Sequence, residues 1–152
     1  MKKLTLGLSM LLGTGVWLMG CGDSGSSCDS GQVECDVVCI DAVAPTLTSI
    51  QTEVFAKSCT ASACHDANLP AQNLDLSSLD ASETNLINVD SEQVEGKRVT
   101  PSDTSASYLM NKLLGVDIAP GTTRMPQLSP DGLCTPKIDA IRQWIEDGAP
   151  IQ

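Results

Sequence analysis

Two cysteines and the only histidine of the chain lie in one short segment, as Cys59, Cys64 and His65. Two thiols can add across the vinyl groups of haem, and a histidine that directly follows the second can ligate the iron from the proximal side. The usual spacing places two residues between the cysteines; here residues 60–63 intervene, and all four are small enough to lie against a porphyrin edge. The segment therefore predicts one covalent haem c. The alternative is a Cys59–Cys64 disulfide beside an ordinary surface histidine.

The chain begins with features of an export signal. Lys2 and Lys3 precede an apolar run over residues 4–19, which is short for a membrane span, so residues 1–20 are predicted to be a secretory signal peptide. The run ends in Leu-Met-Gly before Cys21 and resembles a bacterial lipoprotein cleavage box, which implies lipidation of Cys21. We expect a protein of the cell envelope, lipid-anchored to the inner or outer membrane and periplasmic or surface-exposed. A plain secreted protein is the alternative.

Charge and cysteine content limit the function further. The formal net charge of −10 disfavours nucleic acid as a partner, because its phosphates would be repelled. The same acidity can steer a basic redox partner protein or simply keep the chain in solution. Export implies an oxidising compartment, so four further cysteines are predicted to form two disulfides in any of three connectivities. These are Cys28, Cys35, Cys39 and Cys134.

Hydrophobic periodicity predicts helices. A helix opens at Pro45 and runs into Ser58, with an apolar stripe of Leu47, Ile50, Val54 and Phe55. A turn of helix is expected over 81–88, a second main helix from Ser102 or Asp103 to Leu114, and a third from Thr135 to Gly148. No segment alternates convincingly with period two. The fold class is therefore predicted to be all-α, with three main helices and long loops over residues 45–152, preceded by a flexible, cysteine-bearing tether over 21–44.

The region from about Pro45 to Pro150 resembles a small c-type cytochrome domain of exported bacterial proteins. The matching segments occur in the family's order, at residues 54–59, 64–65, 73–76, 99–109, 124–126 and 141–149. Two departures are the wide gap between the cysteines and Ser102, which stands where the family has glycine. The resemblance implies a cytochrome c-like fold around one haem.

Two methionines outside the signal peptide compete to be the sixth ligand of the iron. Met110 lies among leucines in a predicted helix, where core packing explains it, whereas Met125 lies in a loop rich in proline and glycine and precedes Pro126. His65 and Met125 are therefore the predicted iron ligands. The resemblance also implies that Trp144 packs against the first helix near Val54 and Phe55.

These expectations lead to a lipid-anchored monohaem c-type cytochrome that transfers electrons. A His–Met pair leaves no open iron position, so we predict an electron carrier and name no catalytic residue. One alternative is a peroxidase-like enzyme with five-coordinate haem. The other is a haem-free lipoprotein, stapled by disulfides, that acts as an interaction module.

Overall fold

The computed structural model describes residues 28–151, and its first element is a β-hairpin. Strand β1 (Gln32–Cys35) pairs antiparallel with β2 (Val38–Asp41), with Val33 opposite Ile40. This hairpin corrects the all-α prediction: the fold is mixed, with helices and a two-stranded sheet. Each strand has only four residues, too few for alternation to be recognised in the sequence. The hairpin is held instead by its turn and by the Cys28–Cys39 disulfide.

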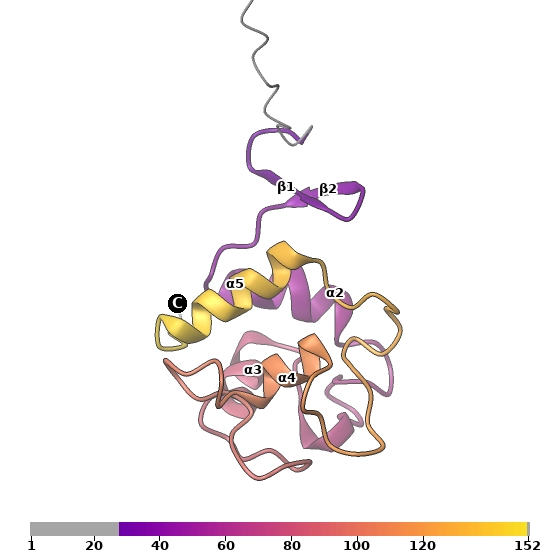
Figure 1. Cartoon of the computed structure of the whole chain (residues 1–152), viewed down its shortest axis with the longest axis vertical. Helices are drawn as coiled ribbons and strands as arrows, with labels where there is room; N and C mark the ends of the chain where they lie inside the picture. Colours follow the sequence, from indigo (N-terminus) through magenta and orange to yellow (C-terminus); the bar gives the residue numbers. More distant parts are fainter. Residues whose placement is uncertain (1–27, 152) are drawn as a thin grey trace, which may run out of the picture.

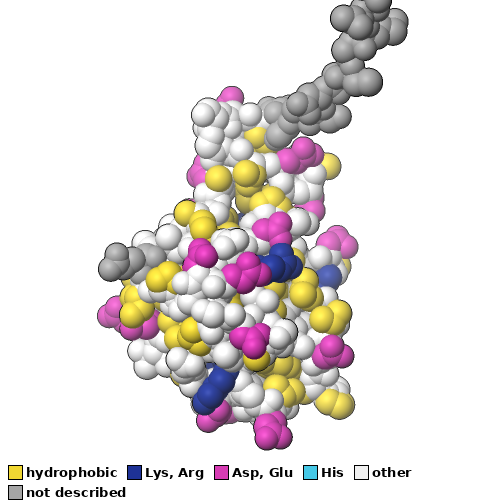
Figure 2. All heavy atoms as spheres, turned by 60° about the vertical axis from the view of Figure 1, so that its left-hand side comes forward, with side chains coloured by type: hydrophobic (Ala, Val, Ile, Leu, Met, Phe, Trp, Pro, Cys, Tyr) yellow, Lys and Arg dark blue, Asp and Glu magenta, His cyan; other side chains and the backbone are white. Residues whose placement is uncertain are grey.

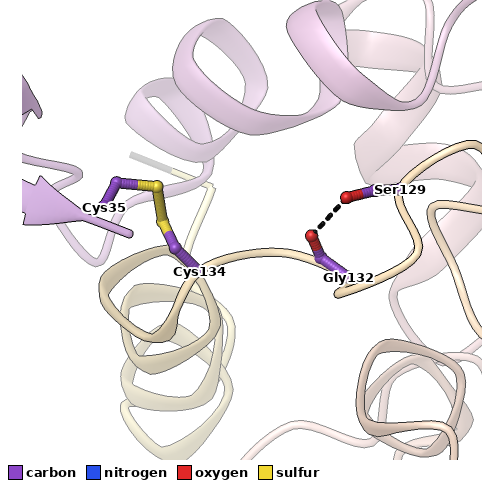
Figure 3. The surroundings of a disulfide bond; sticks show 4 residues. All are labelled: Cys35, Ser129, Gly132 and Cys134. Carbon is purple, nitrogen blue, oxygen red and sulfur yellow. Dashed lines mark hydrogen bonds between the residues drawn. A yellow bond between two sulfur atoms is a disulfide. The ribbon is translucent and has the colours of Figure 1, made fainter. Parts of the chain in front are cut away.

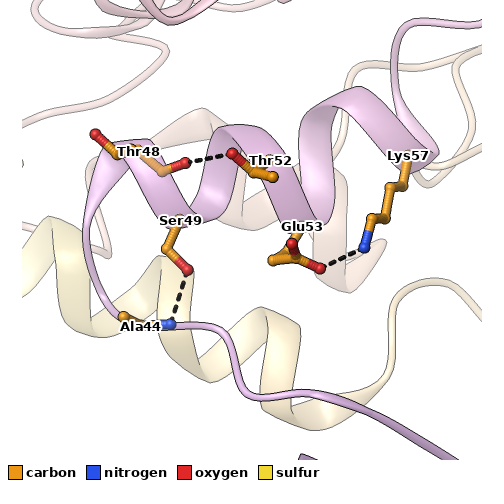
Figure 4. A network of polar contacts seen from close by, with 6 residues as sticks. All are labelled: Ala44, Thr48, Ser49, Thr52, Glu53 and Lys57. Carbon is orange, nitrogen blue, oxygen red and sulfur yellow. Dashed lines mark hydrogen bonds and ion pairs between the residues drawn. The ribbon is translucent and has the colours of Figure 1, made fainter.

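The first helix of the domain is continuous but changes its hydrogen-bond pattern. It consists of α1 (Leu47–Ile50), the π-helical η1 (Gln51–Phe55) and α2 (Ala56–Ser58). Thr46 caps it by accepting a hydrogen bond from the Ser49 amide. Along its exposed side, the Thr52 hydroxyl donates to the Thr48 carbonyl and Lys57 pairs with Glu53 (Figure 4).

The remaining helices are short, except the last. They are η2 (Ala71–Asn73), α3 (Leu79–Leu86), α4 (Tyr108–Leu114) and α5 (Thr135–Glu146). Helix α4 begins later than predicted because the Asp103 carboxylate accepts hydrogen bonds from the Ser105 hydroxyl and the Ala106 amide, which form a turn of their own. It ends as predicted at Gly115, which has a left-handed φ of 71°.

Helix α5 lies across the first helix and closes the core (Figure 1). Its Trp144 and Ile145 are completely buried, as are Leu47, Ile50 and Val54 of the first helix. The Trp144 indole donates a 2.8 Å hydrogen bond to the Pro150 carbonyl, so its one polar atom is satisfied. Trp144 therefore belongs to the same core as Val54 and Phe55.

A second disulfide joins the hairpin to the domain. Cys35 at the end of β1 is bonded to Cys134 at the start of α5, in a segment where the Ser129 hydroxyl also donates to the Gly132 carbonyl (Figure 3). The predicted count of two disulfides is thus confirmed, and the pairing is settled. Two disulfides indicate an oxidising, extracytoplasmic location.

The charged side chains on the visible surface are mainly acidic. Figure 2 shows aspartates and glutamates spread over the visible face, with few lysines or arginines. Within residues 28–151, no helix has the length and apolar character that a bilayer span requires.

Candidate ligand-binding pocket

An apolar pocket lies between the first helix, α4 and the loops that follow Cys59 and Leu86. Its volume is about 980 Å³, including the part open to solvent. The walls come from segments far apart in sequence, because helices as short as α3 and α4 need long loops to complete the enclosure. The apolar side chains that line it include Phe55, Leu74, Leu76, Leu86, Leu109 and Leu113.

His65 is one of the polar residues in the pocket wall. Its Nδ1 lies 3.0 Å from the Leu74 carbonyl oxygen, and since a carbonyl only accepts, Nδ1 carries the proton and Nε2 keeps its lone pair. The backbone amide of Leu76 donates in turn to the His65 carbonyl at 2.9 Å. Burial is the main reason that the pKa of His65 is lowered, although the backbone carbonyls of Leu74 and Ala71 oppose this shift. The positive charges of Arg98 and Lys112 lower the pKa further. The imidazole is therefore held neutral in one tautomer.

Cys59 also lines the pocket, and its thiol is protonated at neutral pH. Burial, together with the nearby Cys64, raises the pKa of the Cys59 thiol to about 12. Both cysteines are free thiols, so the alternative of a Cys59–Cys64 disulfide is not what the structure shows. Cys64 is not among the residues that line the pocket.

Arg98 and Lys112 contribute two buried cations to the wall, with 7% and 8% of their surfaces exposed. Arg98 donates to the carbonyls of Gln72 at 2.7 Å and Asn85 at 2.8 Å, and Lys112 donates to that of Thr123 at 2.6 Å. Burial lowers the pKa of both groups. Arg98 thus holds η2 and α3 together, and Lys112 holds the loop around Thr123 against α4, so the walls are fixed before any ligand arrives. Arg98 was not predicted as a pocket residue, because a single arginine beside Val99 belongs to no recognisable motif.

The two methionines lie where their sequence contexts suggested. Met110 is 4% exposed and belongs to the hydrophobic core, whereas Met125 is half-buried and lines the pocket. The Met125 amide donates to the Lys112 carbonyl at 2.8 Å, which holds its loop against α4. The structure therefore brings Cys59, His65 and Met125 to one pocket and leaves Cys64 out of it. Cys21, the predicted lipidation site, is outside the described residues.

The prediction of one covalent haem c is wrong. Four cysteines are consumed in the Cys28–Cys39 and Cys35–Cys134 disulfides, and the described residues contain no group of three or more His, Cys, Asp or Glu side chains that can hold a metal ion. Attachment through both remaining thiols would also require both in the pocket wall, and only Cys59 lies there. We therefore assign no haem to this chain, and His65 and Met125 are described as pocket residues.

Comparisons with models of protein families, with curated proteins and with solved structures found no match. The resemblance of short motifs to a c-type cytochrome domain thus stays a prediction. Any functional assignment depends on the pocket itself.

Proposed function

We propose that this chain is an exported, haem-free binding module, stapled by two disulfides, that holds an apolar small molecule in the pocket. The observation that carries the proposal is the wall, which is formed mostly by leucines and by Phe55, with only a few polar groups. Such composition is typical of small-molecule sites, where burial of apolar surface drives binding and the polar groups orient the ligand. Lipid anchoring at Cys21 is part of the proposal.

The polar groups support binding with little rearrangement. Arg98 and Lys112 are bonded to backbone carbonyls, and His65 is fixed by the Leu74 carbonyl. A pre-organised site loses little conformational entropy when a ligand enters. Electron transfer and peroxidase-like chemistry are not part of the proposal, because both depend on haem.

A neutral apolar probe tests the proposal. N-phenyl-1-naphthylamine should bind the purified chain saturably, with one probe per protein, in a fluorescence titration excited where tryptophan does not absorb. Leu109→Trp adds bulk to the pocket wall and should weaken binding about tenfold or more. Leu114→Trp is the matched control, since Leu114 lies on the same helix, is 42% exposed and does not line the pocket. Absence of saturable binding, or equal weakening by both variants, would overturn the proposal.

A further inference from the structure

Two cysteines within residues 28–151 belong to neither disulfide. Cys28, Cys35, Cys39 and Cys134 are paired, whereas Cys59 and Cys64 are free. The paired cysteines indicate a compartment that oxidises thiols, so two neighbouring free thiols are chemically exposed to the same conditions. We propose that Cys59 and Cys64 are a site of reversible oxidation, at which a third disulfide forms and opens while the other two stay closed.

The backbone already brings the two ends of this segment together. The His65 amide donates to the Cys59 carbonyl at 3.1 Å, and the Cys64 amide donates to the Ala61 carbonyl at 2.9 Å. The segment is therefore a closed turn with one cysteine at its start and the other at its end. The two thiols are also near enough to interact electrostatically, because the charge of Cys64 helps to raise the pKa of Cys59.

The residues between the cysteines leave room for rearrangement. Residues 61–63 are exposed, so an oxidant can approach from the solvent. Ala63 has a φ of 64°, a left-handed conformation that is unfavourable for alanine. A disulfide needs its Cα atoms roughly 4.4–6.8 Å apart, and a turn of small residues with one unfavourable conformation can adjust to that requirement without moving the core.

The chemistry is a thiol–disulfide exchange with a small-molecule disulfide such as oxidised glutathione. One thiolate attacks a sulfur of the oxidant, forms a mixed disulfide and releases one reduced glutathione. The second cysteine then attacks the mixed disulfide, the Cys59–Cys64 bond forms, and the second reduced glutathione leaves. The protein loses two electrons and two protons, which the two released thiols carry away. Because Cys59 resists deprotonation, the exchange is slow.

Oxidation and ligand binding should oppose one another, an inference that rests on the proposed function. Cys59 is part of the pocket wall and Cys64 is not, so a bond between them turns the Cys59 sulfur away from the pocket. A ligand that packs against Cys59 favours the reduced form. By thermodynamic reciprocity, the oxidised form then binds the ligand more weakly, by the same factor.

The test equilibrates the full exported chain in buffers of reduced and oxidised glutathione, traps free thiols by alkylation in denaturing urea and maps the peptides by mass spectrometry. The Cys59–Cys64-linked peptide should appear with oxidised glutathione and disappear with reduced glutathione, while Cys28–Cys39 and Cys35–Cys134 persist throughout. Cys64→Ser should abolish the linked peptide, and Ser62→Ala, within the same turn, should leave it unchanged. Thiols that remain alkylatable at every ratio, or that stop at mixed disulfides, would overturn the proposal.

N-phenyl-1-naphthylamine titrations of the same samples test the coupling. The dissociation constant should be larger for the oxidised wild type than for the reduced one, and the Cys59–Cys64 disulfide should form less readily when the probe is present. Equal affinities would overturn the coupling but not the disulfide. If the reduced protein binds no probe, the proposed function fails, while the peptide map still decides whether the two cysteines pair.

Discussion

The Ser82 hydroxyl donates a buried 2.6 Å hydrogen bond to Oε1 of Gln51, and this contact joins α3 to the π-helical turn of the first helix. Nε2 of Gln51 donates to the Leu76 carbonyl at 2.9 Å, so one side chain holds both α3 and the loop that forms part of the pocket. A π-helical turn is uncommon and is often found beside functional sites. Here it includes Phe55, which lines the pocket.

Removing this contact should destabilise the domain. Ser82→Ala leaves the buried Gln51 oxygen without a donor, and we expect a loss of about 1–3 kcal/mol in the free energy of unfolding, measured by urea titration. Thr84→Ala, at an exposed position of the same helix, should change it by no more than about 0.5 kcal/mol. Equal effects of the two substitutions would contradict the role assigned to the contact.

The two disulfides should differ in their contribution to stability. Cys35 and Cys134 are separated by 99 positions, whereas Cys28 and Cys39 are separated by 11. The longer closed loop restricts the unfolded chain more, so the double substitution Cys35→Ala, Cys134→Ala should cost about 2–5 kcal/mol. Cys28→Ala, Cys39→Ala opens only the hairpin and should leave the thermal midpoint of the helices, followed by circular dichroism, nearly unchanged. The reverse order would show that the hairpin supports the helices.

The stability of the protein should depend on pH through His65. Its pKa in the folded protein is lowered from 6.5, so the unfolded chain binds a proton more readily. The contribution of neutral His65 to the free energy of unfolding is fully present above the pKa of His65 in the unfolded chain. It is lost as the pH falls through the pKa of His65 in the folded protein. The urea midpoint should therefore decrease between about pH 7 and pH 5, and less so in His65→Asn. An identical decrease in the variant would assign the effect to other groups.

Cys59 should resist alkylation in the native protein. In Cys64→Ser it is the remaining free thiol of the described chain, and burial, the larger cause of its raised pKa, is unchanged. Iodoacetamide at neutral pH should modify it slowly in buffer and rapidly in denaturing urea, because only the thiolate reacts. Rapid labelling without denaturant would show that the thiol is accessible and ionised.

Met110 and Met125 should respond differently to truncation. Met110→Ala removes a core side chain and should cost about 2–5 kcal/mol of stability. Met125→Ala should weaken binding of N-phenyl-1-naphthylamine with a smaller loss of stability, because Met125 is half-buried and lines the pocket. Leu128→Ala provides a reference in the same loop, since Leu128 is 84% exposed and should affect neither property.

Local sequence signals predicted local structure well. The stripe that begins at Leu47 is buried, Gly115 ends α4, and Pro136 lies in the first turn of α5, since each depends on spacing or backbone geometry alone. The hairpin and the π-helical turn were missed. Their strands and turns are too short to leave a periodic pattern, and the hairpin depends on a disulfide whose pairing no sequence specifies.

The pocket was predicted in part. His65 and Met125 were predicted as ligands of the haem iron and do line one cavity, but the haem itself, predicted from Cys59, Cys64 and His65, was wrong. The placement of Cys64 outside the wall and of Arg98 inside it depends on how the loops fold over the core. Sequence spacing does not contain that information, because the residues that fix Arg98 are Gln72 and Asn85, far from it along the chain.

The bond between Cys35 and Cys134 also determines how the molecule responds to mechanical force. Tension applied between a point before Cys35 and a point after Cys134 passes through the two sulfur atoms, so residues 36–133 carry none of it. The walls of the pocket lie between Phe55 and Met125, entirely within this shielded segment. A chain pulled at its N-terminal end would therefore stretch outside the pocket before the pocket itself is deformed.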